Sequence, residues 1–155
     1  MATVETLPLE TLYEQDETAW LESMSELIRL GRFEAIDYPN LAEYLSDMAG
    51  RDRREVRSRL VMLLMHLLKW AHQPEKRSRS WRTTVLNQQQ ELRVLAGRGV
   101  LRVHANEVLV EAYQDAIDLA TSETGLNREV FPSECSYSFD QLLILALNEA
   151  EDPLA

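Results

Sequence analysis

Residues 56–81 read VRSRLVMLLMHLLKWAHQPEKRSRSW and contain the longest apolar run of the chain. From Leu60 to Leu68, every position except His66 is apolar. A helix that is apolar on all sides must be covered by neighbours, whereas a helix that crosses a bilayer needs about 20 apolar residues. We therefore expect a central core helix covered by other helices, and no membrane-spanning segment.

This central helix is expected to begin near Asn40 and to end near His72. Asn40, with Glu43 three residues later, resembles a capping pair. Gly50 should not end the helix, because one glycine costs only about 1 kcal/mol relative to alanine in a helix interior. After His72, Pro74 disfavours helical geometry in the residue before it, so the chain should turn there.

The composition favours helices throughout. The chain has 155 residues, of which 45% are hydrophobic, and only five Gly and five Pro. That length can bury the core of one domain, but strand-rich folds need more turn residues than this. We expect a single all-α domain over residues 1–155, with loose tails at about 1–10 and 149–155. Its architecture should be a bundle of about four longer helices with one or two short C-terminal ones.

Capping residues and glycines mark the ends of the other helices. In the helix that follows the turn, residues 88–91 (QQQE) are expected to face away from the core. One expected helix begins at Asp16 and ends at Gly31, and a second begins at Ser78 or Ser80 and ends at Gly97 and Gly99. A third runs from Val100 to Gly125, and a fourth begins at a capping box formed by Ser138 and Gln141.

The net charge of −10 hides an uneven distribution. Residues 51–82 contain ten Lys or Arg against three Asp or Glu, a net charge of +7, so the remainder of the chain carries −17. This basic stretch either pairs with acidic helices inside the fold or faces an anionic partner. An acidic protein repels nucleic acid at long range, so we favour internal pairing. Acids on the outer side of the 100–124 helix are the expected counterparts, namely Glu107, Glu111, Asp115 and Asp118.

The turn at residues 76–82 combines basic and aromatic side chains. Guanidinium groups bind phosphate and a flat ring can stack on a base, as in single-strand binding. Arginine also stacks on tryptophan or pairs with carboxylates within a fold, and we favour this structural use. The ligand-binding candidates of this region are Lys69, Trp70, Arg77, Arg79, Trp81 and Arg82.

Several short motifs follow one another along nearly the whole chain. They are Leu12-Tyr13-Glu14-Gln15-Asp16, Arg57-Ser58-Arg59-Leu60, His66-Leu67-Leu68-Lys69-Trp70, Gln73-Pro74-Glu75, Arg77-Ser78-Arg79-Ser80-Trp81, Glu111-Ala112-Tyr113, and Phe131-Pro132 through Cys135. With this order the chain resembles the bacterial domain of unknown function twenty-nine family. The resemblance implies an all-helical fold, and it implies no activity because the family has no established reaction.

Arg59 and His66 are seven residues apart, which is two helical turns on the same face. This spacing superficially resembles the active motif of the HEPN ribonucleases. There, a histidine near its ordinary pKa could act as acid or base while an arginine steadies the phosphate. We favour the alternative that His66 is a core histidine bonded to Glu111 or Asp115, and that Arg59 is exposed or salt-bridged.

No metal or cofactor is expected. The histidines and Cys135 form no ligand pair at helical or finger spacing, and neither a glycine-rich phosphate loop nor a nucleophile elbow is present. Cys135 is expected to be a small apolar filler. A single cysteine suits a reducing interior, and the N-terminus lacks signal-peptide sections, so we expect a cytoplasmic protein.

Two classes of function remain open. The first, which we favour, is a non-enzymatic helical protein-interaction module of the bacterial cytosol, whose partner is a protein, a second copy included. The alternative is a nucleic-acid-binding protein or HEPN-like ribonuclease that uses Arg59, His66 and the turn at residues 76–82. Arginines held against acids would favour the first class, and arginines lining an open cleft with His66 would favour the second.

Overall fold

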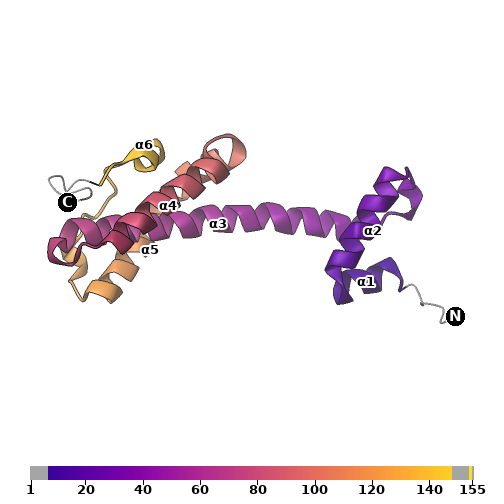
Figure 1. The fold of residues 1–155 in the computed structure, drawn as a ribbon, viewed down its shortest axis with the longest axis horizontal. Helices are drawn as coiled ribbons and strands as arrows, with labels where there is room; N and C mark the ends of the chain where they lie inside the picture. The colour runs from indigo at the N-terminus through magenta and orange to yellow at the C-terminus, as the bar shows by residue number, and fades with distance from the viewer. Residues whose placement is uncertain (1–6, 148–153, 155) are drawn as a thin grey trace. The chain divides into compact units, whose positions relative to one another are not determined.

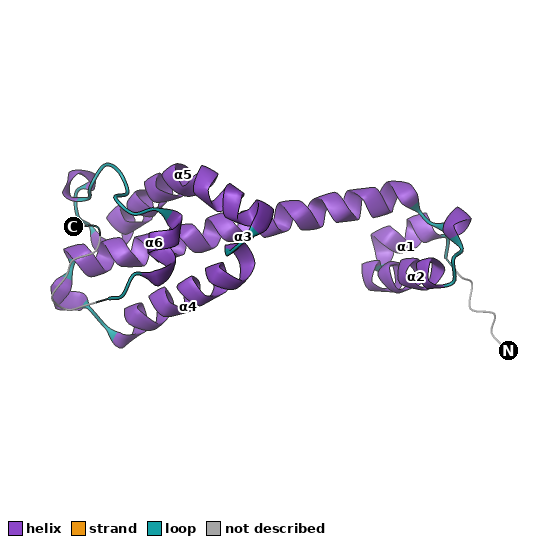
Figure 2. Ribbon diagram, turned by 90° about the horizontal axis from the view of Figure 1, so that it is seen from above, coloured by secondary structure: helices purple, strands orange, loops and turns teal. Residues whose placement is uncertain are grey.

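The structure is a computed structural model that describes residues 7–147 and Leu154. Within this part all regular structure is helical and no strand is present (Figures 1 and 2), which confirms the expected all-α class. Short 3₁₀ turns lie at Phe33–Ala35, Pro74–Lys76 and Arg128–Val130. The α-helices are α1 (Leu9–Gln15), α2 (Glu17–Arg29), α3 (Tyr38–His72), α4 (Arg79–Ala96), α5 (Gly99–Thr124) and α6 (Phe139–Ile144).

The chain forms two compact units, unit 1 (Met1–Gly50) and unit 2 (Arg51–Ala155), where the sequence predicts one domain. Helix α3 runs from the first unit into the second. A loose tail is expected at residues 1–10, of which residues 1–6 lie outside the described residues. Leu9 and Glu10 belong to α1. The tail expected at residues 149–155 also lies outside them, except for Leu154, which is buried.

Trp20 is the centre of unit 1. Its side chain is fully buried, and its Nε1 donates to Asp37 Oδ2 at 3.1 Å. The helix expected to start at Asp16 does so, because the Asp16 carboxylate accepts from the backbone N–H of Ala19. The start expected at Asn40 is wrong. Helix α3 begins at Tyr38, and the Asn40 amide donates to Asp37 Oδ2 at 2.7 Å, within the first turns of the helix.

The core of unit 2 is built on the second half of α3. Leucines from this half are fully buried, and α4 and α5 lie along it (Figures 1 and 2). Helix α5 turns Ala112, Ala116 and Ala120 inward, all fully buried, and small side chains let two helices approach closely. The sequence predicts that the central run is covered on all sides, but one side of it is open, since Met62 is 37% exposed. The fully buried leucines of α3 are Leu60, Leu63, Leu64, Leu67 and Leu68.

The ends of the helices in unit 2 follow their capping residues. Helix α3 ends at His72 before Pro74, and Ser78 Oγ accepts from the backbone N–H of Trp81 to cap α4. Gly125 ends α5 with φ +70°, a left-handed conformation that favours glycine. The expected capping box is also present, because the side chains of Ser138 and Gln141 each accept from the other's backbone N–H. These four predictions are confirmed.

Gln89 departs from the sequence expectation. Residues 88–91 were expected to face away from the core, yet Gln89 is only 3% exposed. Its Nε2 donates to the backbone oxygens of Leu142, at 2.9 Å, and Leu145, at 2.7 Å. The last carbonyls of a helix have no partner within it, so a buried amide at this position closes the end of α6.

Candidate functional site

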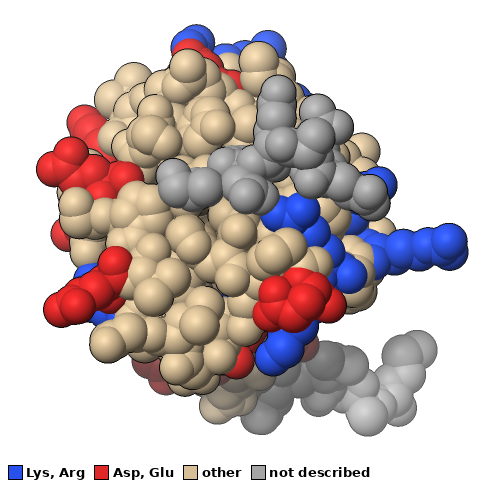
Figure 3. Space-filling model, turned by 90° about the vertical axis from the view of Figure 1, so that its left-hand side faces the viewer, with Lys and Arg blue, Asp and Glu red and all other residues tan. Residues whose placement is uncertain are grey.

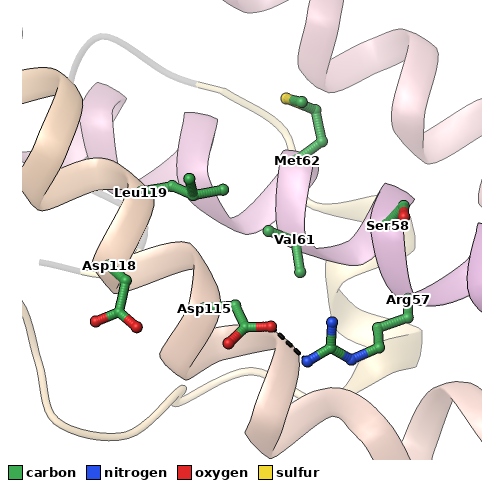
Figure 4. Close-up of a pocket in the computed structure, with 7 residues that line it drawn as sticks. All are labelled: Arg57, Ser58, Val61, Met62, Asp115, Asp118 and Leu119. Carbon is green, nitrogen blue, oxygen red and sulfur yellow. Dashed lines mark hydrogen bonds and ion pairs between the residues drawn. The ribbon is translucent and has the colours of Figure 1, made fainter.

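The central part of the basic stretch is paired inside the fold. Arg57 forms ion pairs with Asp115 and, at 3.8 Å, with Glu111, both on α5. Figure 4 shows the Arg57 guanidinium pointing at the Asp115 carboxylate across a hollow of about 470 Å³ between α3 and α5. This pairing agrees with the expectation that acids of the 100–124 helix face the basic stretch.

Arg59 and Lys69 are also engaged. Arg59 Nε donates to Glu55 at 2.9 Å, its Nη1 donates to Gln88 at 3.1 Å, and its Nη2 lies 3.7 Å from Glu91. Two carboxylates therefore offset its charge. Lys69 Nζ lies 2.6 Å from Glu123 and 4.5 Å from the centre of the Trp81 ring.

A pocket of about 250 Å³, called here the Trp70 pocket, lies where α3 ends and α4 begins. The turn at Pro74–Lys76 reverses the chain, and the Ser78 cap then starts α4, so the first turn of α4 returns beside the last turn of α3. Figure 3 views this end of unit 2, where Lys and Arg side chains gather on one side of the face. The pocket is lined by Trp70, Arg77, Ser78, Arg79 and Arg82.

The Trp70 ring holds two of the arginines. The guanidinium carbons of Arg77 and Arg82 lie 5.0 and 5.4 Å from the ring centre, within the range of cation–π contacts. Arg77 Nε also donates to the backbone oxygen of Trp70 at 2.8 Å. Trp70 itself is 2% exposed, and its buried Nε1 has no hydrogen-bond partner among the described residues. None of the described residues that line the pocket is acidic.

The ligand candidates chosen from sequence thus divide into two groups. Four of them, Trp70, Arg77, Arg79 and Arg82, line one pocket, whereas Lys69 and Trp81 contact each other. Ser78 joins the pocket without having been a candidate. The sequence does predict Ser78 as a possible cap of α4. A cap lies at the start of its helix, and here the start of α4 forms the pocket wall, so the capping pattern could have identified Ser78 as a lining residue.

His66 does not bond to an acid of α5. Its Nδ1 lies 2.9 Å from the backbone oxygen of Met62 on the preceding turn of α3, so the expected bond to Glu111 or Asp115 is wrong. Burial lowers the pKa of His66, which keeps the ring neutral at pH 7. The ring borders a groove of about 650 Å³ between α3 and α4. Among the described residues, the structure shows no bond between His66 and Arg59.

Cys135 fits the expected role of a small filler. It packs against the core of unit 2, and its Sγ lies 3.4 Å from the backbone oxygen of Tyr137. Burial raises the pKa of its thiol, so the less reactive protonated form is favoured. In the described ranges, no three His, Cys, Asp or Glu side chains are grouped to hold a metal ion. No described helix is both long and apolar enough for a membrane crossing.

Unit 1 exposes a set of large apolar side chains around a small core. Trp20 and Met24 are the buried apolar side chains among its described residues. Between positions 28 and 45, by contrast, five large side chains are about half exposed. This set, called here the unit 1 apolar surface, consists of Ile28 (49%), Leu30 (57%), Phe33 (55%), Tyr38 (56%) and Leu45 (59%).

Comparison with known proteins gives a family and no activity. Residues 12–146 match the family described as Domain of unknown function DUF29. No curated protein and no solved structure matches the chain significantly. The match covers nearly all of the chain, including both the Trp70 pocket and the unit 1 apolar surface.

Proposed function

The chain belongs to the family Domain of unknown function DUF29, and we propose that it is a non-enzymatic helical protein-interaction module. Its partner is a protein that covers the unit 1 apolar surface. The observation that carries this proposal is the contrast between two buried apolar side chains, Trp20 and Met24, and the five half-exposed large ones between positions 28 and 45. We also propose the bacterial cytoplasm as its location, because a chain with a single cysteine suits a reducing compartment.

The exposed side chains matter as a group. Single exposed apolar residues are ordinary on a protein surface, whereas a contiguous patch of them marks an interaction site. Fully burying one large apolar side chain contributes about 1.5–3 kcal/mol. Covering a half-exposed one therefore contributes on the order of 1 kcal/mol. A small unit has little core of its own to stabilise it, so a partner that covered these five residues would stabilise unit 1 as well as bind it.

The charge of unit 1 indicates the charge that the surface of its partner should carry. Residues 1–50 contain eleven Asp or Glu and two Arg, a net charge of −9. Complementary charge speeds association and like charge opposes it. The partner should therefore present an apolar patch with a basic rim. Unit 1 of a second copy does not meet this requirement, because it carries the same net charge of −9.

The ribonuclease alternative has less support from the geometry. The Arg59 guanidinium contacts two carboxylates and a glutamine, and the His66 ring bonds to a backbone oxygen. The two groups that a ribonuclease would need, the Arg59 guanidinium and the His66 ring, are thus already bonded to other groups of the chain. They also share no common partner.

Site-specific photo-crosslinking in bacteria tests the proposal. A photoreactive amino acid at Phe33 or Leu45 should give a discrete protein adduct. The same group at Val94, which is 88% exposed on α4, should give none and serves as the control. The double substitution Leu30→Ser and Tyr38→Ser should abolish the adduct at Phe33. Equal adducts at Val94, or none at either unit 1 position, would contradict the proposal.

A further inference from the structure

We propose that the Trp70 pocket binds a phosphate monoester, a single phosphoryl group with two negative charges. The pocket lies wholly within unit 2. This inference does not rest on the proposed function of unit 1. Its ligand would be either a small phosphorylated molecule or a phosphorylated side chain, which share the same phosphoryl chemistry.

The charge at the pocket is not offset by carboxylates as it is at three basic residues of α3. Arg57, Arg59 and Lys69 each have a carboxylate partner. Arg79 and Arg82, in contrast, make no ion pair within the described residues. Arg77 is already engaged, so we assign it the role of holding the pocket wall through its bond to the Trp70 backbone oxygen.

The pocket is also organised before any ligand arrives. The Trp70 ring fixes the guanidiniums of Arg77 and Arg82 on the pocket wall, and arginine in a fixed geometry can bind phosphate through two parallel N–H donors. Groups that are already ordered lose less conformational entropy on binding.

Helix α4 adds a second source of positive potential. It is 18 residues long, and Ser78 and Arg79 at its start line the pocket. The first N–H groups of a helix have no partner within it, and the helix dipole is positive at this end. Helix N-termini commonly bind phosphate for these two reasons. The side chains of Arg79 and Arg82 would then supplement the backbone donors.

The size and surroundings of the pocket favour one phosphoryl group over a nucleic-acid strand. A strand binds through several phosphates in a row and needs a track of unpaired cations. On α3, Arg57, Arg59 and Lys69 are paired with carboxylates, and the whole chain carries −10. A pocket of about 250 Å³ with two unpaired guanidiniums instead matches the two charges of a phosphate monoester.

Isothermal titration calorimetry on the full chain tests this inference. The titrants are inorganic phosphate, a short peptide that carries one phosphoserine, the same peptide without phosphate, and a single-stranded RNA that lacks terminal phosphates. The phosphopeptide or inorganic phosphate should bind, and the unmodified peptide and the RNA should not. Tighter binding of the phosphopeptide would identify a side-chain phosphate as the ligand, and tighter binding of inorganic phosphate would identify a small molecule. Binding should also strengthen from pH 5 to pH 7, because the second phosphate pKa lies near 6.

Three substitutions locate the site. Arg79→Gln and Arg82→Gln should each weaken phosphate binding at least about tenfold, since each removes a charge-assisted hydrogen bond. Arg98→Gln, the same change in the exposed residue before α5, should weaken it less than about twofold because general charge is screened by salt. Circular dichroism checks that all three variants fold. Absence of phosphate binding, an equal loss in Arg98→Gln, or tighter binding of the RNA would each overturn the inference.

Discussion

Replacing Gln89 with alanine should destabilise unit 2, although sequence patterning places this residue on the outside of α4. The substitution removes the amide that donates to the backbone oxygens of Leu142 and Leu145. Both oxygens belong to the end of α6, where no further helical turn supplies donors. The effect should therefore be local to the contact between α4 and α6.

The expected loss follows from the burial of the two acceptors. Leu142 is buried, so its oxygen cannot regain a bond to water, and a buried acceptor left unpaired costs about 1–3 kcal/mol. The Leu145 oxygen is partly accessible, so water can replace its bond and the loss is about 0.5–1.5 kcal/mol. Together these give a loss of roughly 1.5–4.5 kcal/mol in the free energy of unfolding.

Urea unfolding followed by circular dichroism measures this loss, and Gln90→Ala is the matched control. Gln90 is the next residue on α4 and is exposed, so its substitution should change the free energy by less than about 0.5 kcal/mol. Hydrogen exchange should also show faster exchange of α6 amides in Gln89→Ala alone. Equal urea midpoints for the two variants would refute the reasoning.

Three further predictions concern the two cores and His66. Leu64→Ala should cost about 2–5 kcal/mol in urea unfolding, because Leu64 is fully buried; an unchanged midpoint would count against the central position of α3. Asp37→Ala should cost about 1–3 kcal/mol and shift the fluorescence of Trp20, whose indole loses its acceptor, and unaltered emission would contradict that hydrogen bond. His66 has a lowered pKa in the folded chain, so the unfolded chain binds its proton more readily and the unfolding free energy should fall as the pH drops below about 6.5. His66→Gln should flatten this pH dependence, and a slope equal to that of the unsubstituted chain would show that His66 does not cause it.

Local signals in the sequence predicted most of the helix ends. Asp16, Ser78 and Ser138 cap helices as expected, and the α3 helix ends before Pro74. Such features depend on residues within one turn, so the sequence contains all of the needed information. Asn40 shows the limit of this approach. It has the chemistry of a cap, but Asp37 lies in a position to accept from both Trp20 and Asn40, and α3 starts earlier.

Features that depend on distant neighbours could not be predicted. Gln89 is polar and lies among polar residues, and only the arrival of α6 more than fifty residues later explains its burial. His66 is a different case, because the sequence predicts a distant acid as its partner and the actual partner is local, the backbone oxygen of Met62 on the preceding turn. In the candidate site, helical spacing separates Lys69 from Trp70 by about 100°, so they face different neighbours. Trp70, and not Lys69, lies beside the arginines because of the direction in which the turn at Pro74–Lys76 returns the chain.

The most direct test of the interaction-module account is native-state hydrogen exchange on the purified chain, at a concentration where it is monomeric. A segment with few buried apolar contacts opens at a lower free energy than a well-packed core. The account predicts that amides of α1 and α2 in unit 1 exchange much faster than those of α4 and α5 in unit 2. The account also predicts that their exchange slows when the crosslinked partner is added. Protection of α1 and α2 equal to that of α5 in the monomer would contradict the claim that unit 1 alone is weakly stabilised and gains stability from a partner.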